Sequence, residues 1–76
     1  MKDLLVEMVK ALVDNPDQIK VSEIKSKHTI VLELSVAKED LGKIIGKQGR
    51  NAQAMRTILT SASGKLKKHV VLEILE

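Results

Sequence analysis

The stretch Leu41-Gly42-Lys43-Ile44-Ile45-Gly46-Lys47-Gln48-Gly49-Arg50 decides the fold. Its aliphatic residues before Gly46 have the spacing of a helix, and a second helical pattern begins after Gly49. Two glycines three positions apart allow a turn with positive φ angles, and they carry no β-carbon that would keep a ligand at a distance. The stretch therefore predicts two short helices joined by a corner whose backbone is open to a ligand.

The residues of this corner are suited to a phosphate chain. Amides of the loop and of the first turn after Gly49 have no helical partner, and they lie at the positive end of the second helix. Lys47 and Arg50 add charge there, and Ile45 offers an apolar surface on which a base can rest. Gln48 can donate or accept hydrogen bonds. The candidate binding residues are Lys43, Ile45, Gly46, Lys47, Gln48, Gly49 and Arg50.

Positive charge is concentrated around this loop. The whole chain has 13 Lys and Arg against 10 Asp and Glu, which gives a net charge of only +3. Between positions 43 and 68, however, every charged side chain is basic: Lys43, Lys47, Arg50, Arg56, Lys65, Lys67 and Lys68. Such a one-signed stretch attracts a polyanion. For the last three lysines, solvated charges at the entrance of a strand are the favoured interpretation, and contact with nucleic acid is the alternative.

Before this stretch, the chain predicts one helix and two strands. Residues 2–14 carry an apolar stripe in steps of four, and Pro16 prevents the helix from continuing. A strand starts at Ile19-Lys20-Val21, and its alternation slips before Ile24, which indicates a bulge or a position at the sheet edge. The next strand alternates cleanly, and its inward residues are Ile30, Leu32, Leu34 and Val36.

The second half predicts two helices and a last strand. Residues 37–45 form a short helix whose inward residues are Leu41, Ile44 and Ile45. The helix after Gly49 runs to about residue 62, with a buried face of Ala52, Met55, Leu59 and Ala62. Val70, Leu72 and Ile74 then alternate in a strand. The order predicts one α+β domain over residues 1–76, with three helices on one face of a three-stranded sheet.

The sequence resembles the KH domain family. Ile44-Ile45-Gly46-Lys47-Gln48-Gly49 matches its signature, an aliphatic pair followed by Gly-x-x-Gly with a basic residue inside. The order helix-strand-strand-helix-helix-strand is similar to the bacterial type II KH fold, so the resemblance covers the whole chain. Length and the string from Gly42 to Arg50 look like the stand-alone bacterial KH proteins of the KhpA (YlqC) family. The resemblance implies single-stranded RNA as a partner, and a homodimer or a heterodimer with a larger Jag-type (KhpB) KH protein.

Two features argue for low sequence specificity. Many KH domains carry a larger aliphatic residue where this chain has Ala52, and the smaller side chain should make the groove wider or shallower. The chain also has no Phe, Tyr or Trp, although ring stacking gives many RNA-binding proteins about 1–3 kcal/mol per base. We therefore expect weak binding led by phosphate contacts, as in a post-transcriptional regulator or an RNA chaperone.

Other classes of function are weighed against this interpretation. An enzyme is not expected, because no nucleophile, base and orienting group can be assembled, and neither metal nor cofactor is implied by a chain without Cys and with two His. A dimerisation module remains open, because Val31, Val71 and Leu75 lie opposite the predicted core residues. Without an apolar run of about 20 residues, we expect a cytoplasmic protein that does not contact the membrane.

Overall fold

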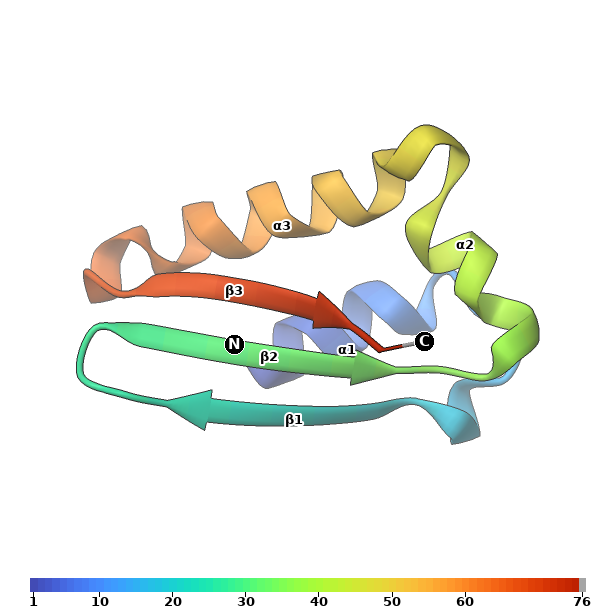
Figure 1. Cartoon of the computed structure of the whole chain (residues 1–76), viewed down its shortest axis with the longest axis horizontal. Helices are drawn as coiled ribbons and strands as arrows, with labels where there is room; N and C mark the ends of the chain where they lie inside the picture. Colours follow the sequence, from blue (N-terminus) through green and yellow to red (C-terminus); the bar gives the residue numbers. More distant parts are fainter. Residues whose placement is uncertain (76) are drawn as a thin grey trace.

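A three-stranded sheet with helices on one side forms the structure (Figure 1). The computed structural model describes residues 1–75. In chain order its main elements are α1 (Lys2–Lys10), β1 (Lys20–Lys25), β2 (Thr29–Ser35), α2 (Leu41–Ile45), α3 (Arg50–Ser63) and β3 (His69–Ile74). Short 3-10 helices connect them: η1 (Pro16–Gln18), η2 (Lys38–Asp40), η3 (Lys47–Gly49) and η4 (Gly64–Leu66). The α+β fold predicted from the sequence is confirmed, in the predicted order helix-strand-strand-helix-helix-strand; residue 76 of the predicted domain lies outside the described residues.

The sheet combines an antiparallel pair with a parallel pair. Its strand order is β1-β2-β3, in which β1 and β2 are antiparallel and β2 and β3 are parallel. Pairing of β1 with β2 is continuous from Lys20 opposite Ser35 to Lys25 opposite Ile30. The slipped alternation of β1 therefore reflects its position at the sheet edge and not a bulge. Parallel pairing of β2 with β3 requires a crossover, which α2 and α3 supply.

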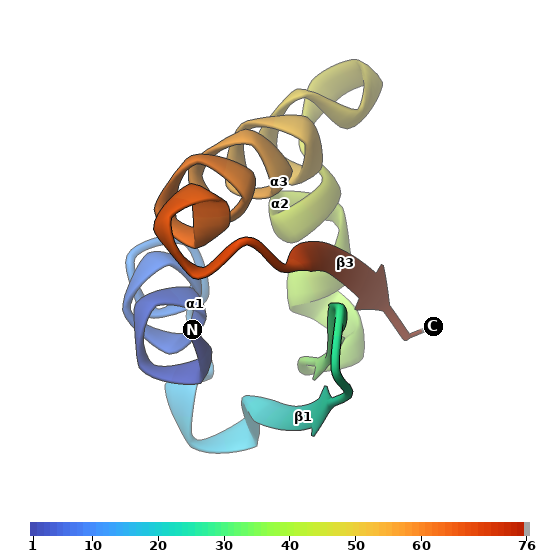
Figure 2. The same ribbon diagram turned by 90° about the vertical axis from the view of Figure 1, so that its left-hand side faces the viewer.

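The helices bury one face of the sheet, and Figure 2 shows α1 and α3 on the same side of it. Leu5 and Val9 of α1 are fully buried, as are Leu32 of β2 and Leu59 of α3. These side chains meet in a single core that also includes Ile30, Leu34, Ile44, Met55, Val70 and Leu72. None of the helices within residues 1–75 is long and apolar enough to cross a membrane.

Helix boundaries differ from the sequence prediction in two places. Helix α1 ends at Lys10 instead of residue 14, and the turn after it is irregular, because the amide of Leu12 donates to the carbonyl of Val9, three residues back and not four. The predicted helix over residues 37–45 begins as the 3-10 turn η2, and only its second part is α-helical. The prediction that the first helix continues to residue 14 was therefore wrong. Helix α2 has a single turn of α-helix before the glycine loop.

Two predicted core positions also differ. Helix α3 buries Ser63 instead of Ala62, because the stripe that starts at Ala52 reaches the core again at Ser63. The Ser63 hydroxyl donates to the carbonyl of Thr60 at 2.9 Å, which satisfies the buried group. In α2 only Ile44 is buried, whereas Leu41 and Ile45 are half-buried and remain accessible.

Apolar side chains also lie on the sheet face away from the helices. Val31 is paired with Ile24 on β1 and with Val71 on β3, so the three side chains form a row across the sheet. Ile24 is 55% exposed and Leu75, just after β3, is 47% exposed. No helix of the described chain covers this face, as Figure 2 shows.

Adjacent residues of α3 provide a test of the core. Leu59 is fully buried and Ile58 is 46% exposed. Replacing Leu59 by alanine leaves a cavity, so we expect the free energy of unfolding to fall by about 2–5 kcal/mol. The matched change Ile58→Ala should cost roughly 1 kcal/mol or less. Urea denaturation measures both, and equal losses would contradict the burial described here.

Candidate nucleic-acid interface

The Gly46–Gly49 loop has an unusual backbone. Gly46 has φ 76° and ψ 176°, a region that is essentially open only to glycine. A β-carbon at Gly46 would also lie 2.7 Å from Cγ of Asn51, which is closer than side chains approach. Gln48 (φ 58°) and Gly49 (φ 75°) are left-handed as well. The chain therefore reverses sharply between α2 and α3 instead of continuing as one helix.

Only part of the loop's amides are free for a ligand. The amide of Gly46 donates to the carbonyl of Gly42 at 2.8 Å, and that of Gly49 donates to the carbonyl of Gly46 at 3.2 Å. The Arg50 amide donates to the carbonyl of Lys47. Within residues 1–75, no acceptor is recorded for the amides of Lys47 and Gln48. The sequence predicted free amides along the whole loop, whereas the structure leaves two adjacent free donors in it, the amides of Lys47 and Gln48.

Charged and polar side chains surround the two free amides. Lys47, Gln48 and Arg50 are all exposed, and Nη2 of Arg50 lies 3.4 Å from Oε1 of Gln48. Leu41 and Ile45 are one turn apart, so they share one face of α2. A hollow begins at the far end of this face, and its lining residues are Ser35, Val36, Lys38, Leu41 and Leu75.

The fold divides the basic stretch into two groups. Lys47 and Arg50 lie at the start of α3, whereas Lys65 and Lys67 follow its end. The 14 residues of α3 separate the two groups by about 20 Å at 1.5 Å per residue, and Figure 1 shows both ends of the helix. Arg56 lies between them and donates from Nη2 to the carbonyl of Leu72 on β3 at 3.5 Å. The lysines after α3 therefore do not belong to the loop site.

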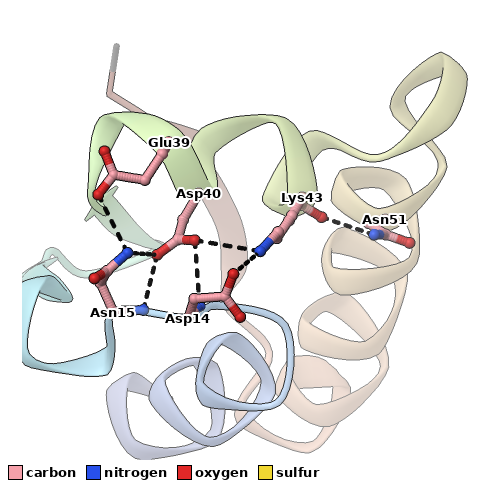
Figure 3. Close-up of polar contacts among 6 residues, drawn as sticks. All are labelled: Asp14, Asn15, Glu39, Asp40, Lys43 and Asn51. Carbon is pink, nitrogen blue, oxygen red and sulfur yellow. Dashed lines mark hydrogen bonds and ion pairs between the residues drawn. The ribbon is translucent and has the colours of Figure 1, made fainter.

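Lys43 has acidic partners on the side of α1. Its Nζ donates to Oδ2 of Asp14 and lies 3.7 Å from Oδ1 of Asp40 (Figure 3). Asp40 is fully buried and accepts hydrogen bonds from the amides of Asp14 at 3.2 Å and Asn15 at 3.0 Å. Nδ2 of Asn15 adds a third bond at 3.1 Å. This network, which we call the Asp40 cluster (Asp14, Asn15, Asp40 and Lys43), ties the segment between α1 and η1 to α2.

Comparison with known proteins agrees with this geometry. A family model described as the KH domain of KhpA/KhpB matches residues 2–74, which include the loop and every helix and strand. The chain belongs to the KhpA/KhpB KH-domain family.

Relatives of similar length support the same assignment. A protein named RNA-binding protein KhpA from Aquifex aeolicus is 54% identical over 76 residues, which cover all of this chain and 96% of the relative. The protein of that name from Caldanaerobacter subterraneus is 53% identical over 75 residues, 99% of this chain and all of the relative. The one from Chlamydia pneumoniae is 49% identical over 76 residues, all of this chain and 97% of the relative. No solved structure matched.

Sequence reasoning on this KhpA/KhpB-type chain missed the Asp40 cluster. In the sequence, Asp40 lies within the predicted helix over residues 37–45 without a predicted partner, and Lys43 is among the candidate RNA contacts. In the segment after α1, the structure brings Asp14 against both residues and Asn15 against Asp40. One signal was present in the sequence, because Asp40 is an acid three residues before a lysine at the border of a stretch with only basic charges.

Hydrogen bonds set the protonation of the Asp40 cluster. Burial by itself would raise the pKa of Asp40, but the bonds from Asp14 and Asn15 and the charge of Lys43 outweigh it and hold the pKa below its ordinary value of 3.8. The bond to Asp14 is the main cause that raises the pKa of Lys43 above 10.5. Both groups are therefore charged at neutral pH.

The Asp40 cluster should stabilise the KhpA/KhpB fold in a pH-dependent way. Because the folded pKa of Asp40 lies below 3.8, its contribution is complete above about pH 4 and is lost as the pH falls through the folded pKa. Asp40→Asn should therefore unfold at a lower urea concentration than wild type at pH 7, and the difference should shrink below pH 4. Urea denaturation between pH 3 and pH 7 measures this difference.

Glu39→Gln is the matched control for this change. Glu39 is exposed and accepts one bond, from Nδ2 of Asn15 at 3.2 Å. We expect this variant to unfold close to wild type at every pH. A constant gap between Asp40→Asn and wild type down to pH 3 would show that the charge of Asp40 does not stabilise the fold.

Proposed function

We propose that this chain binds single-stranded RNA at the Gly46–Gly49 loop. The observation that carries the proposal is a pair of adjacent free amides, on Lys47 and Gln48, placed between the exposed cations of Lys47 and Arg50. Phosphate oxygens are strong acceptors, and amides at the N-terminus of a helix are suited to them. The relatives at about half identity are named RNA-binding proteins, which supports the same ligand class.

The loop geometry indicates how a strand would lie. Gly46 and Gly49 keep the backbone bare, so a sugar-phosphate chain can reach the two amides, while Lys47 and Arg50 reduce its charge. In KH domains such a loop holds about four nucleotides. Bases would then rest on the face of α2 that carries Leu41 and Ile45, towards the hollow that begins at Leu41.

Low sequence specificity follows from the side chains available to bases. The chain has no aromatic ring on which a base could stack. Ala52, at the start of α3, is only 5% exposed, so it offers a base little contact area. We propose that phosphate contacts supply most of the affinity, which suits an RNA chaperone or a post-transcriptional regulator of many transcripts.

Lys43 takes a different part in this proposal from the other candidate residues. Its Nζ is paired with Asp14 and Asp40, so it fixes α2. It contributes to RNA binding only by long-range electrostatic attraction and not by direct contact. Gly46, Lys47, Gln48, Gly49 and Arg50 are the proposed phosphate contacts, and Ile45 is a proposed base contact.

A second candidate function is pairing with another protein. The row Ile24, Val31 and Val71 and the exposed Leu75 favour it, since these apolar side chains lie on a sheet face that no helix of residues 1–75 covers. A homodimer and a heterodimer with a larger Jag-type (KhpB) KH protein both stay predictions, as do the cytoplasmic location and the absence of enzymatic activity.

Reversing the charge of the loop should abolish RNA binding. Lys47 and Gln48 are exposed, and aspartate accepts the left-handed backbone of Gln48, so the double change Lys47→Asp with Gln48→Asp should leave the fold intact. We expect the Kd for a short single-stranded RNA to rise by at least about a hundredfold, because attraction of the phosphates turns into repulsion. Fluorescence anisotropy measures the Kd, and circular dichroism checks the fold.

The matched control is Lys67→Asp with His28→Asp, which makes the same change in formal charge at the other end of α3. Lys67 is left-handed like Gln48, and both control residues are exposed. RNA binding by this control should weaken only slightly. Equal losses in the two double variants would mean that overall charge, and not the loop, holds the RNA.

A further inference from the structure

Asn51, in the first turn of α3, reaches back across the loop to α2. Its Nδ2 donates to the carbonyl of Lys43 at 2.8 Å, and Figure 3 shows this bond. The side chain is half-buried, and its Cβ and Cγ lie directly over Gly46, where a β-carbon would come within 2.8 Å and 2.7 Å of them. Asn51 thus fills the space between the two arms of the loop.

The Lys43 carbonyl is the acceptor that a longer α2 would use. In a continuous α-helix, the amide of Lys47 would donate to this carbonyl four residues earlier. The backbone of Gly46 breaks the helix, so the carbonyl needs another donor. Asn51 supplies that donor from the opposite helix, and the amide of Lys47 is then left without a recorded acceptor within residues 1–75.

Lys43 is consequently held at both ends. Its carbonyl is bonded to Asn51 and its Nζ is paired with Asp14 and Asp40, so α2 is fixed from α3 and from the segment that follows α1. A carbonyl oxygen can accept two hydrogen bonds, so the bond from Asn51 acts by holding the two arms of the Gly46 break in place, which keeps the amide of Lys47 out of reach of this carbonyl. This arrangement keeps the amide directed away from α2.

We infer that Asn51 is a positioning residue for RNA binding, which takes the carbonyl of Lys43 and thereby leaves the amide of Lys47 free for a phosphate. The inference rests on the proposed function, because it assigns this amide to the RNA. Asn51 itself does not touch the ligand in this account.

Asn51→Leu separates the donor from the packing. Leucine has nearly the size of asparagine and can still cover Gly46, but it cannot donate a hydrogen bond. Without the Asn51 amide, the carbonyl of Lys43 should capture the amide of Lys47. The Kd for a short, labelled single-stranded RNA of mixed sequence should then rise about tenfold, the size of one charge-assisted hydrogen bond.

A second readout distinguishes positioning from direct contact. Hydrogen exchange of the Lys47 amide, followed by NMR in the protein without RNA, should slow in Asn51→Leu, since the amide has gained an acceptor. Asn51→Ala removes both the donor and the packing, and it should show the same weaker binding. It replaces Asn51→Leu in the test if the leucine variant folds poorly. Gln53→Leu is the matched control, because Gln53 is exposed two residues further along α3, and it should leave both readouts unchanged.

Three results would overturn the inference or what it rests on. Wild-type affinity in folded Asn51→Leu would show that the bond to Lys43 is not needed. Weaker binding with unchanged exchange of the Lys47 amide would mean that Asn51 contacts the RNA itself. If wild type does not bind RNA at all, the proposed function fails, whereas the exchange of the Lys47 amide still decides whether Asn51 controls that amide.

Discussion

The break in the backbone at Gly46 is the constraint on which the site depends. Its φ of 76° ends α2 after five residues, as the glycine pair in the sequence predicts. Ending a helix leaves carbonyls on one side and amides on the other without partners. The carbonyl of Lys43 is satisfied by Asn51, and the amides of Lys47 and Gln48 are left for a ligand. The same break therefore frees the amides that we propose bind RNA and leaves a carbonyl that Asn51 has to satisfy.

The rest of the fold holds the two arms of this break in place. Parallel pairing of β2 and β3 obliges the chain to cross over between them, and α2, the loop and α3 are that crossover. Helix α3 is anchored by Met55 and Leu59 in the core, and α2 is anchored by Ile44. Because one turn of helix with one buried residue is a weak attachment, the Asp40 cluster adds a polar one from the end of α1. This explains why a buried carboxylate is retained in so small a domain: its oxygens accept from Asp14 and Asn15, so it is not left unpaired.

Regular features of the chain could be predicted from the sequence, and contacts between distant segments could not. The alternation of Ile30, Leu32 and Leu34 specified β2, and the glycine pair specified the corner, because both depend on local geometry. The end of α1 was missed because Leu12 and Val13 continue the apolar pattern, while the amide of Leu12 donates to the carbonyl three residues back, at Val9, and the α-helical pattern is lost. Lys43 was grouped with the RNA contacts because its partner Asp14 is 29 residues away in the sequence. The number of free amides could not be predicted either, since it depends on which loop carbonyls accept from within the loop.

Mapping the contact surface of RNA by amide NMR tests the central claim most directly. The account predicts that a short single-stranded RNA of mixed sequence shifts the amide signals of Lys47 and Gln48 first and most strongly, with smaller changes along α2 and the start of α3. Signals of β1 and of the far end of α3 should stay in place. Shifts confined to α1 or to the open face of the sheet, with the loop signals unchanged, would contradict the account.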